Sequence, residues 1–165
     1  MTPRIEILEE KKLVGKRLKM SFSKYNIGEL WKSFMPRRKE ILNNLTSELI
    51  SMVVYNPNHF EDFKPTNEFE RWATVEVRDF ENVPIEMETF VLPSGKYAVF
   101  SHKGDVSEFQ KTSQNIYNIW LPNSEYILDN RPHFEVLSDK YKNDHPNSEE
   151  EIWIPIKTKQ ENINH

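Results

Sequence analysis

The sequence has no cysteine and few glycines. Without cysteine, the chain of 165 residues has no disulfide, thiolate zinc site or thiol nucleophile. This is typical of proteins in a reducing compartment, so we expect a cytoplasmic location. The four glycines do not have the spacing of a phosphate-binding loop or of a dinucleotide fingerprint, and we therefore expect no nucleotide cofactor.

The sequence also lacks a long apolar run and an excess of positive charge. No stretch of about 18 apolar residues occurs, and the first residues mix basic with acidic side chains instead of leading into an apolar segment. We therefore expect neither a spanning helix nor a secretory signal, and no membrane partner. The net charge of −4 and the isoelectric point near 5.8 argue against direct nucleic-acid binding, which draws its affinity from clustered Lys and Arg.

Motifs for metal binding and catalysis are missing as well. The five histidines are dispersed, with no HExxH pattern, so we expect no metal site. There is no Gly-x-Ser-x-Gly elbow that would expose a serine nucleophile. The residues by themselves therefore assign no catalytic group.

Hydrophobic residues, in contrast, make up 37 % of the chain, and two stretches have the apolar spacing of amphipathic helices. The first begins at Ile27 and should be kinked or divided by Pro36. The second runs from Val106 to Trp120 and should end at Leu121-Pro122, because proline prevents continuation of the helix.

Most other apolar segments are short, rich in Val, Ile, Phe, Tyr and Trp, and bounded by turn residues, which is typical of strands. The expected strands are Arg4–Leu8, Leu13–Phe22, Ile50–Tyr55, Glu70–Val77, Glu86–Leu92, Tyr97–His102, His133–Leu137 and Glu151–Lys157. Together with the two helices, they predict an α+β fold.

The expected elements repeat in the same order. Two strands, a helix and two strands occupy about residues 4–78, and the same order recurs over about 85–157, with the seam in the loop at 79–84. Both "LWKSFMP" and "IYNIWLP" place a Trp near the end of a helix and before a Pro. We expect a single domain, residues 1–165, built as a pseudo-twofold duplicated β-β-α-β-β module. We expect this arrangement to give a curved antiparallel sheet, two main helices and a ligand groove.

Two tight turns are expected inside these halves. The charged segment Glu9–Lys12 would join the first two strands into a hairpin. Pro93-Ser94-Gly95 would join the fifth and sixth strands in the same way, because Pro fixes a turn φ and Gly accepts a positive φ.

Two glutamates, Glu135 and Glu76, each lie between large apolar residues of a strand, so each side chain points away from its apolar neighbours. Either both acids face solvent on a one-sided sheet, or an acid lies at the floor of an aromatic groove and meets a ligand cation. Each aromatic face would add about 0.5–2 kcal/mol to the binding of a cation. The side chains that would wall such a groove are Trp72, Tyr55, Tyr117 and Trp120.

The segments "ELWKSFMPR", "YAVFSHKG", "IYNIWLPNSEY", "PHFEVL" and "EIWIPIK" occur in this order between about Ile5 and Lys157. Together they resemble the GyrI-like small-molecule-binding domain, the effector-binding domain attached to AraC-type and MerR-type transcription regulators. The resemblance implies a duplicated fold with a groove between its halves and a buried glutamate that serves as charge partner of the ligand. That glutamate would be Glu135, with Trp120 near the pocket and Glu76 as a further acid.

The resemblance further implies a stand-alone module that binds amphipathic, cationic aromatic small molecules. Such a module would sequester its ligand or signal through a separate transcription regulator, because no helix-turn-helix precedes the domain. One alternative is a hydrolase of strained-ring DNA-alkylating compounds, with Glu135 as general base and Tyr55 or Tyr117 supplying a hydroxyl. Another is a protein-interaction role such as gyrase inhibition.

Overall fold

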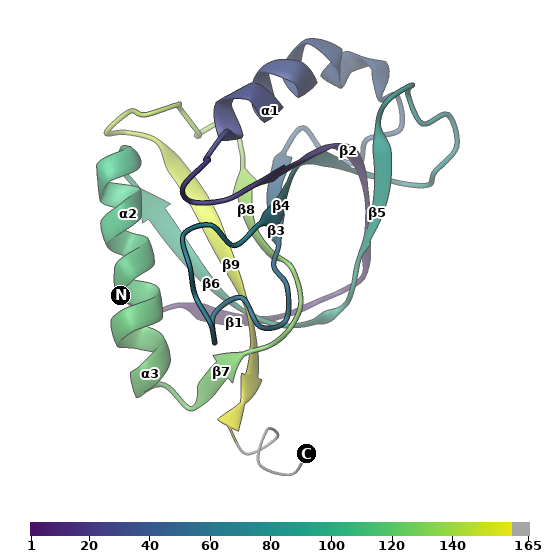
Figure 1. The fold of residues 1–165 in the computed structure, drawn as a ribbon. Coiled ribbons are helices and arrows are strands. Elements are labelled where there is room, and N and C mark those ends of the chain that lie inside the picture. Colours follow the sequence, from purple (N-terminus) through teal and green to yellow (C-terminus); the bar gives the residue numbers. More distant parts are fainter. Residues whose placement is uncertain (160–165) are drawn as a thin grey trace.

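Short segments rich in β-branched and aromatic residues dominate the chain and form strands. A computed structural model describes residues 1–159, whose nine strands are all paired antiparallel (Figure 1). The strands are β1 (Arg4–Leu8), β2 (Lys11–Met20), β3 (Leu49–Val54), β4 (Phe69–Val77), β5 (Glu88–Leu92), β6 (Gly95–Lys103), β7 (Tyr126–Leu128), β8 (His133–Leu137) and β9 (Glu149–Thr158). The helical segments are α1 (Ile27–Phe34), η1 (Met35–Glu40), α2 (Val106–Asn115), η2 (Ile116–Trp120) and α3 (Leu121–Asn123). This content confirms the predicted α+β class.

The order of strands in the sheet is β1-β6-β9-β8-β3-β4-β2-β5, with the short strand β7 beside β9. This order is symmetric about the border between β8 and β3. On one side of the border follow β9, β6 and β1, and on the other side follow their counterparts β4, β2 and β5. Two copies of a strand-strand-helix-strand-strand unit that meet at β3 and β8 would have this order.

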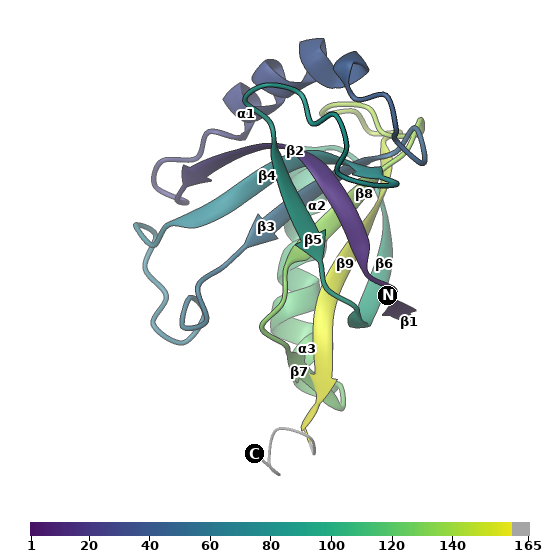
Figure 2. The same cartoon turned by 90° about the vertical axis from the view of Figure 1, so that its right-hand side faces the viewer.

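Both predicted hairpins are wrong. β1 pairs with β6, and β5 pairs with β2, so neither short link joins two paired strands. Leu8 lies opposite Gly95 and Lys11 lies opposite Leu92, so the two links run side by side. Leu8 and Leu92 are buried in the same core. Burying both side chains favours a chain that crosses this core to a distant strand over a chain that turns back into a local hairpin. The resulting ribbon of β1 with β6 and β2 with β5 curves the sheet round on itself (Figure 2).

The inner face of the curved sheet holds the main hydrophobic core. Its side chains come from both halves of the chain, and burying each of them stabilises the fold by about 1.5–3 kcal/mol. The buried members are Leu8, Leu13, Ile50, Met52, Trp72, Leu92, Tyr97, Val99 and Phe134.

Two helices cover the outer face of the sheet (Figure 1). α1 packs on β2 and β4, where Leu30 and Phe34 meet Val75 in a second core. α2 packs on β6, and the helical residue Ile116 meets Phe100 in a third core. The central strands β3 and β8 therefore lie between the areas that the two helices cover.

Both helices are confirmed, with shifted ends. α1 passes at Phe34 into η1, a 3-10 segment with Pro36 near its start. The side chain of Asp105 caps α2 by accepting a hydrogen bond from a backbone N–H of the first turn at 3.0 Å. The second helix continues to Asn123, past the expected stop at Pro122, because a proline is tolerated in the first turn of the last segment, α3. No helix within residues 1–159 is both long and apolar enough to cross a membrane.

Candidate functional site

The outer face of the central strands carries a cluster of polar side chains. Because side chains alternate along a strand, His133 and Glu135 of β8 point to the same face. Glu135 lies opposite Ser51 of β3, and Val53 of β3 lies opposite Arg71 of β4. The register therefore brings a serine, an arginine, a histidine and a glutamate together in the part of the sheet between the two helices.

Arg71 and Glu135 form an ion pair in this cluster. Arg71 Nη2 lies 3.5 Å from Glu135 Oε2 and donates a hydrogen bond to Ser51 Oγ at 2.7 Å. Only 11 % of the Arg71 side chain and 20 % of the Glu135 side chain are exposed, so the two charges interact through a medium less polar than water. Burial opposes the charge of Arg71 and is the largest single effect, but Glu135, with smaller contributions from Tyr25 and Tyr55, more than offsets it and raises the pKa of the guanidinium. The buried Nε of Arg71 has no hydrogen-bond partner within residues 1–159.

Aromatic rings adjoin this ion pair. Tyr117, in the π-helical segment η2, shares a hydrogen bond of 2.9 Å with His133 Nδ1. Phe60, from the loop between β3 and β4, stacks on both rings with centroid distances of 6.1 and 5.9 Å. Tyr55 meets the ring of His133 edge-on at 5.0 Å. A π-helical turn is frequent at functional sites, and here it carries the tyrosine that reaches the central strands.

Burial keeps these rings uncharged at neutral pH. It lowers the pKa of His133 to about 3 and raises the pKa of Tyr55 to about 12. Burial also raises the pKa of Tyr117 well above its ordinary value, with smaller contributions from Tyr55 and Glu135. The rings therefore present neutral, electron-rich faces, which attract cations through their quadrupoles.

A second carboxyl group lies on the same face one strand away. Glu150 of β9 lies opposite His102 of β6, and both line a hollow of about 470 Å³ at the end of the central strands. Burial raises the pKa of Glu150 to about 8, with repulsion from Glu135 adding to the effect and attraction to Arg71 opposing it. Within the described chain, no three His, Asp or Glu side chains are grouped closely enough to hold a metal ion.

The structure brings together Glu135, Tyr55 and Tyr117 of the six predicted site residues. Trp72 and Glu76 lie on the opposite face of β4, because their pairing with β2 places them beside Arg17 and Leu13. The ring of Trp72 packs in the inner core, 5.3 Å from the ring of Phe90. Glu76 forms an ion pair with Lys11 at 3.2 Å.

Trp120 lies on the same side of the sheet as Glu135, but its side chain packs between the second helix and the sheet. Its ring meets Phe100 at 5.1 Å and Tyr126 at 6.2 Å, and it packs against the third core. Trp120 therefore supports the helical segment that carries Tyr117.

Besides Ser51, four residues of this cluster were not anticipated from the sequence. His133 had a usable signal, because it precedes Glu135 by two positions and strand alternation places both on one face. Arg71, like Glu76, is a charged residue in an apolar strand. Whether its side chain lies on the inner or the outer face depends on the pairing register, which cannot be read from the sequence. Phe60 lies in a polar loop without periodicity, and Glu150 lies in an acidic run that reads as exposed surface.

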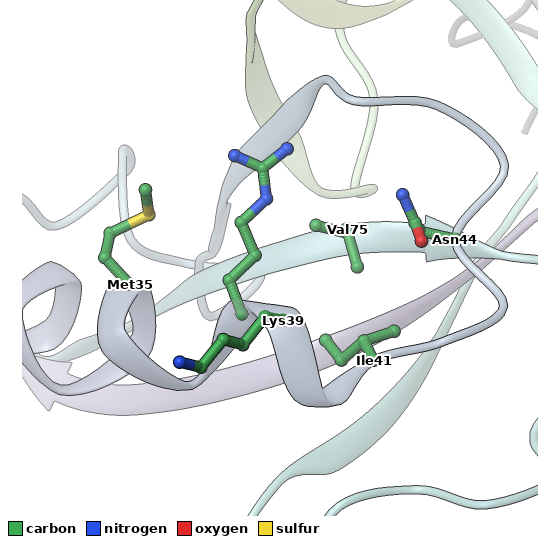
Figure 3. A pocket seen from close by; sticks show the side chains of 6 residues that line it. Met35, Lys39, Ile41, Asn44 and Val75 are labelled. Atoms are coloured by element: carbon green, nitrogen blue, oxygen red, sulfur yellow. The ribbon is translucent and has the colours of Figure 1, made fainter.

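A separate hollow of about 380 Å³ lies beside η1 and the segment that follows it (Figure 3). Arg38 donates a hydrogen bond to the backbone oxygen of Ser47 and so ties the two segments together. The lining residues are Met35, Arg38, Lys39, Ile41, Asn44 and Val75. None of them belongs to the cluster at Glu135, and we assign no function to this hollow.

Residues 1–157 match the GyrI-like small molecule binding domain. This protein therefore belongs to the GyrI-like family, in agreement with the resemblance seen in its sequence.

Among individual relatives, the chain is 31 % identical over 131 residues to the transcriptional regulator BrlR of Pseudomonas aeruginosa. The match covers 79 % of this chain and 46 % of the regulator, so the chain spans about half the length of that relative.

Solved structures share the fold. The structure of SAV2435 bound to tetraphenylphosphonium is similar with a TM-score of 0.75 and 16 % identity, over 100 % of this chain and 99 % of the other. The C-terminal domain of EcmrR is similar with a TM-score of 0.69 and 18 % identity, over 95 % of this chain and 98 % of the other. At these identities, the two structures show the fold that the chain adopts.

Proposed function

We propose that this chain binds hydrophobic small molecules, cationic aromatic compounds in particular, on the outer face of the sheet at Glu135. The observation that carries the proposal is a largely buried carboxylate beside neutral aromatic rings. Partial removal from water strengthens the attraction between Glu135 and a cation. The rings of Tyr55 and Tyr117 add cation–π attraction and apolar contact area. This combination favours apolar aromatic cations over small hydrophilic ones.

The relatives support this class of ligand and suggest how binding is used. SAV2435, which shares the fold, was solved with tetraphenylphosphonium, a hydrophobic aromatic cation. BrlR is a transcriptional regulator, which supports an effector-binding module that acts through a separate transcription regulator or sequesters its ligand. The cytoplasmic location expected from the sequence stays a prediction.

The test is calorimetric titration of the wild type and of Glu135→Gln with tetraphenylphosphonium. We expect the wild type to bind, and the substitution to weaken binding tenfold or more, about 1.4 kcal/mol, because it removes the charge but keeps the shape. Glu76→Gln is the matched control, since Glu76 lies on the opposite face of the sheet and is paired with Lys11. Equal affinity of all three proteins would contradict the proposal, as would absence of binding to the wild type.

The alternatives from the sequence make different predictions for the same samples. A hydrolase would convert more than one equivalent of a strained-ring alkylating compound per protein, and Glu135→Gln would abolish this turnover. A protein-interaction role would leave small-molecule binding absent.

A further inference from the structure

Glu135 already has a cationic partner within the chain. The guanidinium of Arg71 lies 3.5 Å away and is held by a hydrogen bond of 2.7 Å to Ser51 Oγ. Arg71 comes from β4 and Glu135 from β8, on opposite sides of β3, so the register of the three central strands fixes their separation. A ligand cation that approaches Glu135 therefore also meets a fixed positive charge of the protein.

The neighbouring groups do not restore a negative charge to this face. His133 and the tyrosine hydroxyls are neutral at pH 7, because burial lowers the pKa of the imidazole and raises further the pKa values of the tyrosines, which already lie well above 7. Glu150 has its pKa raised to about 8 and is mainly protonated there. The floor of the proposed binding site then carries one positive and one negative charge, which largely cancel for a ligand above them.

Arg71 also has a free donor. Its Nε is buried and has no hydrogen-bond partner within residues 1–159. A buried donor without a partner is costly, and a shift of the Arg71 side chain that brought Nε to a ligand oxygen would remove the cost. A neutral aromatic compound with a strong acceptor oxygen would gain this bond and would not be repelled by the guanidinium.

We propose that Arg71 is the specificity-determining residue of the site: a tethered cation that competes with cationic ligands for Glu135 and admits neutral aromatic ligands that carry a hydrogen-bond acceptor. This inference rests on the proposed function and refines its ligand class. Replacing Arg71 then makes the site more selective for cations, whereas replacing Glu135 makes it less so.

The experiment compares two probes of similar shape, tetraphenylphosphonium and the neutral acceptor triphenylphosphine oxide, by calorimetry. We expect the wild type to bind both with affinities within about tenfold of each other. In Arg71→Met, tetraphenylphosphonium should bind tenfold or more tightly than to the wild type, and triphenylphosphine oxide should bind more weakly. Arg71→Lys is the matched control, because it keeps the positive charge and should keep the weak preference for cations. An unchanged ratio of the two affinities in Arg71→Met would overturn the inference.

A second pair of variants guards against misfolding, because removing one partner of a buried ion pair is strongly destabilising. In Glu135→Gln the guanidinium is unopposed, and tetraphenylphosphonium should be repelled. Adding Arg71→Met to this variant leaves a floor without charge and should restore at least tenfold of the lost affinity. If the double variant binds tetraphenylphosphonium no better than Glu135→Gln, the inference is refuted. If the wild type binds neither probe, the proposed function itself fails.

Discussion

The two faces of the central strands differ sharply, although they are made by alternating residues of the same segments. On the inner face, Phe134 of β8 packs with Met52 and Trp72 in a core of apolar and aromatic side chains. On the outer face, one residue along each strand, Glu135 and Arg71 form a largely buried ion pair. The comparison teaches that strand alternation separates the core from the proposed binding site, because adjacent residues of β8 point to different faces.

The outer face also carries buried polar atoms without a partner. Burying polar groups costs free energy unless every donor and acceptor is paired, and Arg71 Nε and both ring nitrogens of His59 are buried without a partner among the described residues. A stretch of sheet optimised only for stability would place apolar residues at these positions. Local violations of this kind are expected at functional sites.

The largest expected effect is on the inner face. Phe134→Ala should lower the free energy of unfolding by about 3–5 kcal/mol, because it leaves a cavity in a close-packed core. Chemical denaturation of the purified protein measures the difference. Glu135→Gln on the neighbouring residue is the comparison: it leaves Arg71 without its partner, but 20 % of the Glu135 side chain is exposed to water, so the loss of stability should be smaller. A larger loss for the glutamate than for the phenylalanine would break the division between the two faces.

The next effect is a loss of stability in acid that originates on the outer face. The unfolded chain protonates His133 at its ordinary pKa of 6.5, whereas burial holds the folded pKa at about 3. Stability from this residue is therefore present above pH 6.5 and is lost as the pH falls below it. The loss reaches about 2 kcal/mol at pH 5, from 1.36 kcal/mol per pKa unit.

His133→Asn is the variant that tests this effect, because its amide can take the place of Nδ1 beside Tyr117. Denaturation curves at pH 7 and pH 5 should show a smaller loss on acidification in the variant than in the wild type. Equal losses would show that protonation of His133 does not limit acid stability.

A further pH effect concerns Glu150, and its sign is opposite. Its pKa is raised in the folded protein from 4.5 to about 8, so the folded state keeps a proton that the unfolded chain has lost. Stability from this group therefore falls as the pH rises between these values. Glu150→Gln should be no more stable than the wild type at pH 4 and progressively more stable towards pH 8. A stability difference that does not vary with pH would contradict the assignment.

The elements of the fold were predictable from sequence, whereas the pairing of strands was not. The helix starting at Ile27, the helix starting at Val106 and all eight expected strands are present, because local composition and periodicity determine them. The hairpin at Pro93-Ser94-Gly95 was wrong because a local turn signal competes with distant partners, and here β5 pairs with β2 and β6 pairs with β1. The three-residue strand β7 was missed because it is too short to show alternation.

The candidate site was likewise predictable only in part. Glu135 and Tyr117 came from the family resemblance and from helical spacing, and the structure places both at the central strands. Trp72 and Glu76 were wrongly grouped with them. Alternation along a strand shows which residues share a face, but not whether that face is the inner or the outer one. That choice depends on register, and a shift by one residue would exchange Trp72 with Arg71.

The crossed links between β1 and β2 and between β5 and β6 have a consequence for the unity of the domain. Each half lends its first strand to the sheet of the other half, as two subunits do when they exchange strands in a dimer. A single half would lack the strand that covers β2 or β6 and would expose the central edge at β3 or β8. Folding of one half is thus completed only by the other, so the outer surface of β3 and β8 between the two helices forms only in the whole chain.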